Sequence, residues 1–228
     1  MQKDIAELLQ DAEEDEEGLT NDVYFTDEYI IKRYSRYPLN SFLMSLTNVF
    51  SGFEYYSRKR RMSNEVKTKQ LLEDSSFKVP KVIGQNEEFI VFENVEGESG
   101  FKYIDNCSEE KALEVGQKLS EFFKSIHAKD IALRDARLSN YPISENTICS
   151  IDHEYVDLQS NGFIFFFDYL TVLSSARQTD NYCAFKKGLN PRKASVFFSF
   201  LLSLDHAILL ERNWSRFKKT LKSLKCDV

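Results

Sequence analysis

The stretch LRDARLSN, residues 133–140, places an aspartate, Asp135, five residues before an asparagine, Asn140. A positioned carboxylate can orient a reacting hydroxyl group, and a side-chain carbonyl is the kind of hard oxygen ligand that Mg²⁺ prefers. A second carboxylate, Asp152, closes the run TICSID, whose pattern predicts a short strand. Each residue alone is also compatible with ordinary solvated polarity, so their meaning depends on the surrounding elements.

Two charged residues upstream complete a possible reaction centre. Lys32 ends the run YIIK in a predicted strand, where a solubilising edge-strand lysine is the simpler interpretation. Glu65 lies in SNEVKTKQLL, which has helical periodicity. Phosphoryl transfer from ATP needs a cation on the phosphates, its carboxylate partner, a carboxylate that positions the acceptor hydroxyl, and Mg²⁺ ligands. The chain supplies candidates for these parts in the order Lys32, Glu65, Asp135, Asn140 and Asp152.

Strand patterns gather in the first hundred residues and helical patterns follow. A hairpin is expected over residues 23–34 around a turn at 26–27, with Ile30, Lys32 and Tyr34 on one face. A second hairpin is expected over 79–92 around a turn at 84–86. A helix follows over 108–127, and two short strands flank 145–146. We therefore predict an α+β chain with an acidic helical extension (1–17), a β-rich lobe that includes the Glu65 helix (18–97) and a helical lobe (98–228).

The composition excludes several other classes of protein. The 228 residues carry a net charge of −6, which argues against a protein that coats nucleic acid. No signal sequence is visible, and the most apolar stretch, residues 196–210, is shorter than the ~20 residues of a membrane span. The four cysteines are far apart in the sequence, which argues against zinc and against a disulfide framework. We expect a cytoplasmic protein with no membrane association.

From about residue 18 to 220 the sequence resembles the protein-kinase-like superfamily. It is most similar to the small RIO-type atypical protein kinases, and among them to the kinase subunits of the KEOPS tRNA-modification complex. The segments that carry this resemblance are IIKRYSRYPLN, NEVKTKQLL, VPKVIG, ENVEG, SIHAKDIALRDARLSN and ICSID. The resemblance implies a compact two-lobed kinase fold with a reduced helical lobe and ATP and Mg²⁺ as cofactors. It also implies serine/threonine phosphorylation, or ATP hydrolysis that supports a protein partner, with an indirect link to tRNA-modification machinery.

The resemblance also implies where the nucleotide binds. The adenine ring would meet backbone groups of the segment Glu93–Asn94–Val95, which follows a predicted strand. Apolar candidates for the walls of the adenine site are Val23, Ile30 and Ile151, although all three are equally explicable as core residues. His127 is expected to be a structural histidine beneath the catalytic loop. Either Asp168 or Asp180 is expected to hold the backbone of that loop, and spacing does not choose between them.

Several departures from the family leave two alternatives open. Leu133–Arg134 stand where the family has His-Gly, and His153–Glu154 follow Asp152 where it has Phe-Gly. No glycine-rich loop is present, and residues 41–60 resemble an insertion. The altered LRD and DHE flanks motivate one alternative, a pseudokinase that acts as a nucleotide-binding scaffold. Against it stands the retention of Lys32, Asp135, Asn140 and Asp152, which a scaffold has no chemical need to keep. The segments GLTNDVY and IDHEY also resemble choline and aminoglycoside kinases, although only about 75 residues follow Asp152, which favours the small protein-kinase type over such small-molecule kinases.

Overall fold

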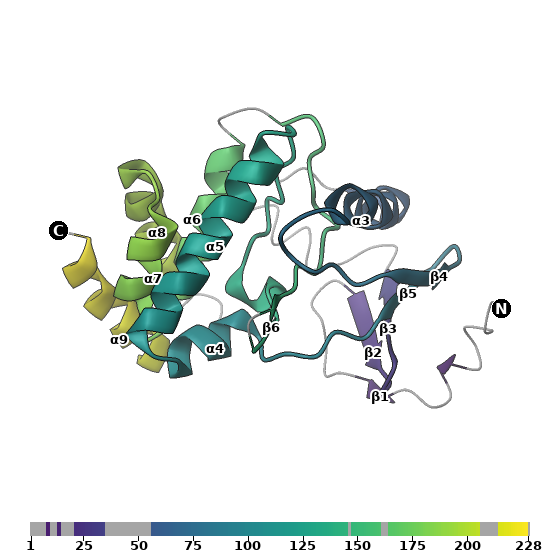
Figure 1. Ribbon diagram of the computed structural model, residues 1–228, viewed down its shortest axis with the longest axis horizontal. Helices are drawn as coiled ribbons and strands as arrows, with labels where there is room; N and C mark the ends of the chain where they lie inside the picture. The colour runs from purple at the N-terminus through teal and green to yellow at the C-terminus, as the bar shows by residue number, and fades with distance from the viewer. Residues whose placement is uncertain are drawn as a thin grey trace. The chain divides into compact units, whose positions relative to one another are not determined.

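The computed structural model describes residues 8–9, 13–14, 21–34, 56–145, 147–160, 164–205 and 214–227 (Figure 1). These residues fall into two compact units. The first holds the described residues up to Asp74 together with Val79–Glu96 and Asp152–Tyr155. The second holds Ser75–Lys78, Gly97–Ile151 and the described residues from Val156 onward. Most of the expected insertion at 41–60 and Gly18 lie outside the described residues.

An antiparallel five-stranded sheet forms the first unit, in the order β1-β2-β3-β5-β4. Its strands are β1 (Glu13–Glu14), β2 (Asn21–Phe25), β3 (Tyr29–Tyr34), β4 (Val82–Gln85) and β5 (Phe89–Glu93). The first predicted hairpin is confirmed, and its turn is closed by Thr26, whose hydroxyl accepts the Tyr29 N–H at 2.9 Å. Because β3 is the central strand, Lys32 does not lie on a sheet edge.

Two strands differ from the sequence prediction. The first strand of the second hairpin begins at Val82 instead of residue 79, since Pro80 has no N–H to give to a ladder. The turn also moves toward the C-terminus, where the Asn86 side chain accepts the N–H groups of Glu88 and Phe89 at 2.9 and 2.8 Å. Glu13–Glu14 pair with β2, where the sequence predicts a helix.

One face of the sheet carries the core that positions Lys32. Ile30, Lys32 and Tyr34 share this face, as predicted, because they are alternate residues of β3 and side chains along a strand point to opposite faces in turn. Helix α3 (Arg58–Leu72) begins after Ser57, whose hydroxyl accepts the Arg60 N–H at 3.3 Å. The core of this face consists of Tyr34, Met62, Ile90 and Phe92, with Ile30, Val66 and Val82 packed against it. Glu65, between Met62 and Val66 on the helix, therefore faces the sheet.

The second unit is mainly helical. Its helices are α4 (Gly100–Asn106), α5 (Glu109–His127), α6 (Phe165–Ala176), α7 (Tyr182–Leu189), α8 (Lys193–Asp205) and α9 (Trp214–Ser223), with 3₁₀ turns η2 (Leu138–Asn140) and η4 (Leu224–Cys226). A short hairpin, β6 (Ile143–Ser144) and β7 (Thr147–Ile148), precedes Ile151. The predicted helix over 108–127 and the predicted hairpin are confirmed. The sequence prediction missed α4, which Ser99 caps by accepting the Lys102 N–H.

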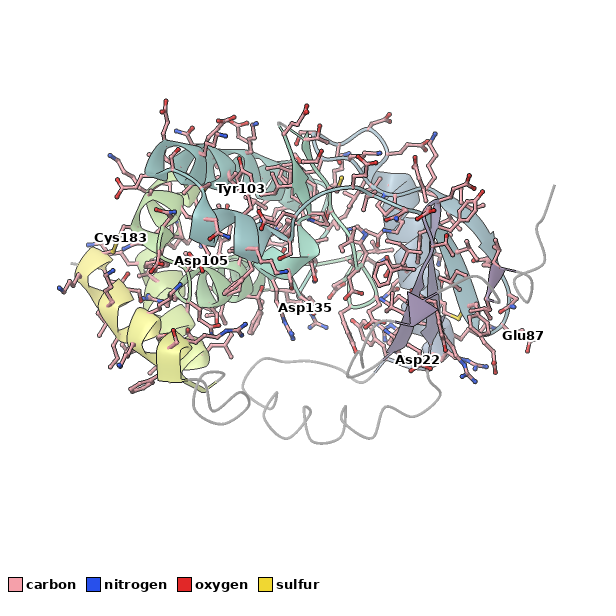
Figure 2. The ribbon with its side chains drawn as sticks, turned by 90° about the horizontal axis from the view of Figure 1, so that it is seen from below. Asp22, Glu87, Tyr103, Asp105, Asp135 and Cys183 are labelled. Atoms are coloured by element: carbon pink, nitrogen blue, oxygen red, sulfur yellow. A yellow bond between two sulfur atoms is a disulfide. The ribbon has the colours of Figure 1, made fainter. Side chains whose placement is uncertain are left out.

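Helices α5 and α7 touch backbone to backbone through two glycines. A Cβ atom on Gly188 would lie 2.0 Å from the carbonyl oxygen of Leu113, and one on Gly116 would lie 2.3 Å from that of Phe185. No side chain fits at either position. Lys219 of α9 holds α4 through Asp105, with Nζ 2.7 Å from Oδ1 (Asp105 is labelled in Figure 2).

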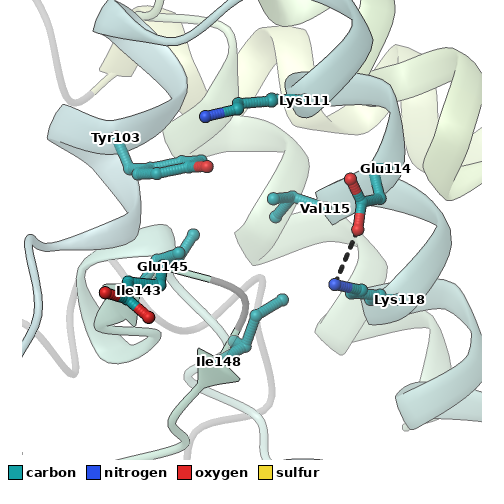
Figure 3. Close-up of a pocket in the computed structure, with 8 residues that line it drawn as sticks. All are labelled: Tyr103, Lys111, Glu114, Val115, Lys118, Ile143, Glu145 and Ile148. Atoms are coloured by element: carbon teal, nitrogen blue, oxygen red, sulfur yellow. Dashed lines mark ion pairs between the residues drawn. The ribbon is translucent and has the colours of Figure 1, made fainter.

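A shallow surface pocket lies between α4, α5 and the β6–β7 hairpin (Figure 3). Apolar side chains from α5 and both hairpin strands line it, including Val115 and Ile148, together with charged groups. Among these, Lys118 is already paired with Glu114 at 2.7 Å. None of the predicted site residues lines this pocket.

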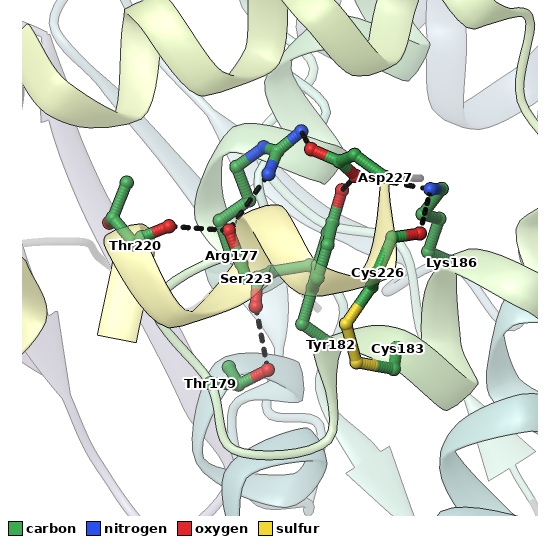
Figure 4. The surroundings of a disulfide bond; sticks show 10 residues. Arg177, Thr179, Tyr182, Cys183, Lys186, Thr220, Ser223, Cys226 and Asp227 are labelled. Carbon is green, nitrogen blue, oxygen red and sulfur yellow. Dashed lines mark hydrogen bonds and ion pairs between the residues drawn. A yellow bond between two sulfur atoms is a disulfide. The ribbon is translucent and has the colours of Figure 1, made fainter. Parts of the chain in front are cut away.

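The C-terminal segment is tied to α7 by a disulfide between Cys183 and Cys226, whose Cα atoms are 5.4 Å apart (Figure 4). The sequence separation of 43 residues gave no sign of this pair, so the expectation that the cysteines form no disulfide is wrong here. Cys107 and Cys149 are not disulfide-bonded. Among the helices that the structure describes, none has the length and apolar character that a membrane span requires.

Candidate active site

The Lys32 amine lies among three carboxylates in the first unit. It donates a hydrogen bond to Oδ1 of Asp152 and lies 3.6 Å from Oε2 of Glu154 and 3.8 Å from Oε2 of Glu65. Burial alone would lower the pKa of Lys32, but the surrounding carboxylates, Asp152 foremost, raise that pKa well above its usual value. The lysine is therefore a fixed cation on the central strand.

Glu65 is held by two elements besides Lys32. Its Oε2 accepts the backbone N–H of His153 at 2.8 Å, and its Oε1 lies 3.2 Å from Nζ of Lys69, one turn further along α3. Burial favours the neutral acid, but Lys69 and Lys32 lower the pKa of Glu65, so the carboxylate is ionised. Burial lowers the pKa of His153 well below its usual value, which leaves this ring neutral beside Lys69.

Asp152 differs from the other two carboxylates in its exposure. Its side chain is 34% exposed, whereas those of Glu65 and Glu154 are 2% exposed. Its φ of 60° lies in the left-handed region, which asparagine and aspartate tolerate better than most residues. One carboxylate oxygen pairs with Lys32, and solvent reaches the group. These hard oxygens fit a divalent cation such as Mg²⁺.

Glu154 forms a buried cluster that the sequence analysis missed. Its Oε2 accepts from Nδ2 of Asn21 at 2.9 Å and from Nη1 of Arg61 at 3.2 Å. Arg61 also donates to Oδ1 of Asn21 at 2.8 Å, and its side chain is 1% exposed. Arg61 is therefore a buried residue of α3, although the basic run at residues 58–61 resembles a solvated helix face. The sequence did contain a signal for buried charge on this helix: Arg61, Glu65 and Lys69 are spaced four residues apart, which places them on one helical face.

The loop with Asp135 and Asn140 belongs to the second unit. Nε of Arg137 lies 2.7 Å from Oδ1 of Asp135, a close ion pair without the alignment of a hydrogen bond. The Asn140 side chain donates its NH₂ group to the Asp135 carbonyl at 2.8 Å, so its own carbonyl oxygen stays available as a hard ligand. The Asn140 backbone carbonyl accepts the N–H of Ile151 at 3.0 Å. Ile151 is the residue directly before Asp152 in the sequence.

Helix α6 anchors this loop through one face. Asp168, Thr171 and Ser175, at positions i, i+3 and i+7 of the helix, accept the N–H groups of the loop. The donors are Leu133 and Arg134 to Asp168 (3.1 and 2.6 Å), Ala136 to Thr171 (3.2 Å) and Leu138 to Ser175 (3.0 Å). The loop backbone is thus satisfied by side chains, which fixes a segment that includes Arg134 at a φ of 64°.

The two residues left open by the sequence have different roles. Asp168 holds the loop, whereas Asp180 lies 3.2 Å from Nζ of Lys219. Nε2 of His127 lies 2.8 Å from Oδ2 of Asp168, and its ring stacks on that of Phe165 with the centroids 4.3 Å apart. His127 therefore packs beneath the loop as a structural histidine, as expected.

Comparison with known proteins gives matches among solved structures. The complex of streptomycin and ATP with APH(2″)-IIa has a TM-score of 0.56 at 14% identity, over 96% of this chain and 97% of that one. The gentamicin complex of APH(2″)-IIa has a TM-score of 0.59 at 12% identity, over 100% and 96%. The ADP-bound aminoglycoside phosphotransferase APH(2″)-Ib has a TM-score of 0.51 at 13% identity, over 99% and 98%. No family model and no curated protein matches the sequence.

The chain has a protein-kinase-like fold. The predicted α+β class, with a β-rich part and a helical part, is confirmed. The solved structures that share this kinase-like fold include phosphotransferases, two of them with ATP or ADP bound. The KEOPS and RIO-type specificity stays a prediction from sequence.

Within the kinase-like fold, the predicted adenine walls lie in both units. Val23 of β2 is directly opposite Lys32, and Ile30 of β3 is opposite Phe92 of β5. Both side chains are partly buried, and Ile30 packs against the core of the sheet face. Ile151 belongs to the second unit. Their role in nucleotide binding stays a prediction.

The segment expected to meet adenine follows β5. Glu93 ends that strand opposite Tyr29, and the Asn94 N–H is already used by the carbonyl of Glu28 at 2.9 Å. In contrast, the backbone of Val95 makes no hydrogen bond to any residue that the structure describes. If this segment meets a base edge, Val95 has the groups to do so.

Proposed function

We propose that this chain is an ATP- and Mg²⁺-dependent phosphotransferase that moves the γ-phosphoryl group of ATP to an acceptor hydroxyl. One observation carries the proposal: a central-strand lysine, a buried helix glutamate and a partly exposed aspartate meet at the amine of Lys32. This arrangement offers a fixed cation to the nucleotide phosphates and a carboxylate that is open to a divalent ion. The kinase-like fold supports the same chemistry.

Each predicted site residue has a role in this proposal. Lys32, oriented by Glu65, would bind the phosphates, and Asp152 with Asn140 would hold Mg²⁺ together with phosphate oxygens. Asp135 would orient the acceptor hydroxyl and receive its proton. The nucleotide base would meet Glu93–Val95 between the apolar side chains of Val23, Ile30 and Ile151. When bound, Mg²⁺ would neutralise charge on the phosphates.

The sequence resemblance favours serine or threonine of a protein as the acceptor, or ATP hydrolysis that supports a protein partner. The link to tRNA-modification machinery and the cytoplasmic location rest on the sequence alone. A second candidate is a small-molecule alcohol. It is favoured by the aminoglycoside phosphotransferases, which match this fold over nearly the whole length of both chains. The short segment after Asp152 therefore does not separate the two acceptor classes.

Thermal unfolding with nucleotide tests the proposal. Mg·ATP at a hundredfold excess over its Kd should stabilise the protein by about 2.7 kcal/mol. Asp152→Asn should lose the Mg²⁺-dependent part of this shift, because asparagine tolerates the left-handed backbone but carries no charge. Asp27→Asn, in the exposed turn after β2, is the matched control and should keep the shift.

Transfer of labelled γ-phosphate then separates the acceptors. The panel would contain proteins, amino-alcohols and aminoglycosides, with release of free phosphate measured in parallel. Turnover confined to small alcohols selects the second candidate. A wild-type protein with no Mg²⁺-dependent shift in ATP would contradict the proposal and favour a non-catalytic scaffold.

A further inference from the structure

Glu154 is a buried acid that phosphoryl transfer does not itself require. Its Oε2 is clamped by Nδ2 of Asn21 and Nη1 of Arg61, at 2.9 and 3.2 Å. Its backbone carbonyl accepts from the side chain of Asn64 at 3.1 Å. A carboxylate buried this deeply is costly unless it is fully paired. The side chain is therefore fixed by β2 and α3 at once.

The same oxygen lies 3.6 Å from Nζ of Lys32. Around that amine the described charged side chains balance: the cations are Lys32, Arg61 and Lys69, and the carboxylates are Glu65, Asp152 and Glu154. Only Asp152 among the three acids is open to solvent. The other two cannot leave without breaking buried contacts.

The proposed function requires that Lys32 stay oriented when Asp152 binds a divalent cation. If Asp152 turns Oδ1 to a divalent cation, it gives up its hydrogen bond to Lys32. Glu65 then remains 3.8 Å away, and its two oxygens are also engaged by Lys69 and by the His153 N–H. A second fixed carboxylate would keep the amine aimed at the phosphates.

We propose that Glu154, clamped by Arg61 and Asn21, is a positioning residue that holds Lys32 in place for the nucleotide phosphates. This inference rests on the proposed function. Glu154 acts through Lys32 and touches neither nucleotide nor acceptor. Loss of its charge is expected to weaken nucleotide binding about tenfold, the order of magnitude of one charge–charge interaction in a mostly buried site, with KM for the acceptor unchanged.

The test must separate this role from simple pairing with Arg61. Glu154→Gln alone leaves a buried guanidinium without its acid, which destabilises the fold. The double variant Arg61→Gln/Glu154→Gln removes both charges, keeps the cluster neutral and leaves side chains that can hydrogen-bond. Arg61→Gln alone is the companion variant, since it removes the guanidinium and retains the carboxylate beside Lys32, so the difference between it and the double variant isolates the charge of Glu154. The measurements are unfolding, KM for ATP and for the acceptor, and calorimetric affinity for ADP in EDTA.

The expected result is a folded double variant with about tenfold higher KM for ATP and weaker metal-free ADP binding. Wild-type values for both would overturn the inference and leave Glu154 as the counterion of Arg61, while the proposed function would stand. If the double variant does not fold, Glu154→Asp keeps the charge but shortens its reach, and wild-type nucleotide affinity there would overturn the inference equally. Failure of the proposed function is distinct, because the wild type itself would then bind no Mg·ATP.

Discussion

At the scale of single residues, Asp135 combines two roles that one substitution can separate. Its backbone carbonyl accepts the Asn140 side chain at 2.8 Å, and its carboxylate lies 2.7 Å from Arg137. Asp135→Asn keeps the backbone contact and the shape but removes the charge that would orient a hydroxyl. We expect kcat to fall by about 10²–10⁴-fold, the usual contribution of a general base. Calorimetry should show Mg·ATP affinity near the wild-type value.

The outcome for binding decides what Asp135 does. If Asp135→Asn loses nucleotide affinity together with rate, the residue supports the loop instead of the reaction. The neighbouring variant Arg137→Met is a useful companion, because it removes the charge partner and leaves the carboxylate. Its unfolding midpoint shows how much of any loss comes from the ion pair, which at 40% exposure of the arginine side chain is expected to be worth about 1 kcal/mol or less.

Only some of the charged contacts around Lys32 can be predicted from the sequence. The spacing of Arg61, Glu65 and Lys69 places them on one helical face, because that relation is local. Their partners, His153 and Glu154, lie more than eighty positions away along the chain. No local sequence pattern predicts contacts between residues that are so far apart in the chain. Lys32 was open to an edge-strand interpretation for the same reason, since strand order depends on pairings between distant segments.

At the scale of elements, the contact between α5 and α7 makes a sharp prediction about packing. Gly188→Ala should lower the free energy of unfolding by about 1–3 kcal/mol or more, because its Cβ would overlap the Leu113 carbonyl at 2.0 Å. Denaturant unfolding measures this loss. Gly84→Ala on β4 is the matched control, since no atom lies within 4 Å of its new Cβ. A neutral Gly188→Ala would mean that the two helices do not pack this closely.

Some elements of this fold can be predicted from the sequence, and others cannot. The first hairpin and α5 follow from periodicity, from the turn that Thr26 closes and from the N-cap Ser108, all of which act within a few residues. The face of α6 that anchors the loop over residues 133–140 does not follow from such local patterns. Asp168 accepts N–H groups that lie 34 and 35 positions earlier, so only folding distinguishes it from Asp180. Thr171 and Ser175 read as ordinary helix residues until the loop is seen against them.

At the scale of the whole molecule, the kinase-like fold is established, whereas neither the reaction nor the acceptor follows from the fold alone. Both units are assembled from separate stretches of chain, and the Asp152–Tyr155 segment belongs with the sheet. The aminoglycoside phosphotransferases share this fold at 12–14% identity, a level at which the fold alone is carried over. Acceptor choice resides in particular side chains. Residues 133–140 and 152 thus predict a reaction class more firmly than a substrate.

The C-terminal segment makes a prediction for the stability of the whole chain. The Cys183–Cys226 disulfide closes a loop of 43 residues, which should stabilise the fold by about 4 kcal/mol through the entropy of the unfolded chain. Arg177 and Lys186 bind Asp227 at 2.6 and 3.0 Å, so the end of the chain has native contacts apart from the covalent bond. Cys183→Ser/Cys226→Ser should therefore fold, with a lower free energy of unfolding.

Denaturant titrations with and without reductant measure this effect. Reductant should bring the wild type down to the level of the double variant and leave that variant unchanged. Cys107→Ser, at a free and partly buried cysteine, is the control and should stay within about 0.5 kcal/mol of wild type. A wild type that is indifferent to reductant would mean that the two thiols are unpaired in solution. In that case the noncovalent contacts of the C-terminal segment, among them those of Arg177 and Lys186 with Asp227, would hold it, and a reducing compartment would not lower the stability of the protein.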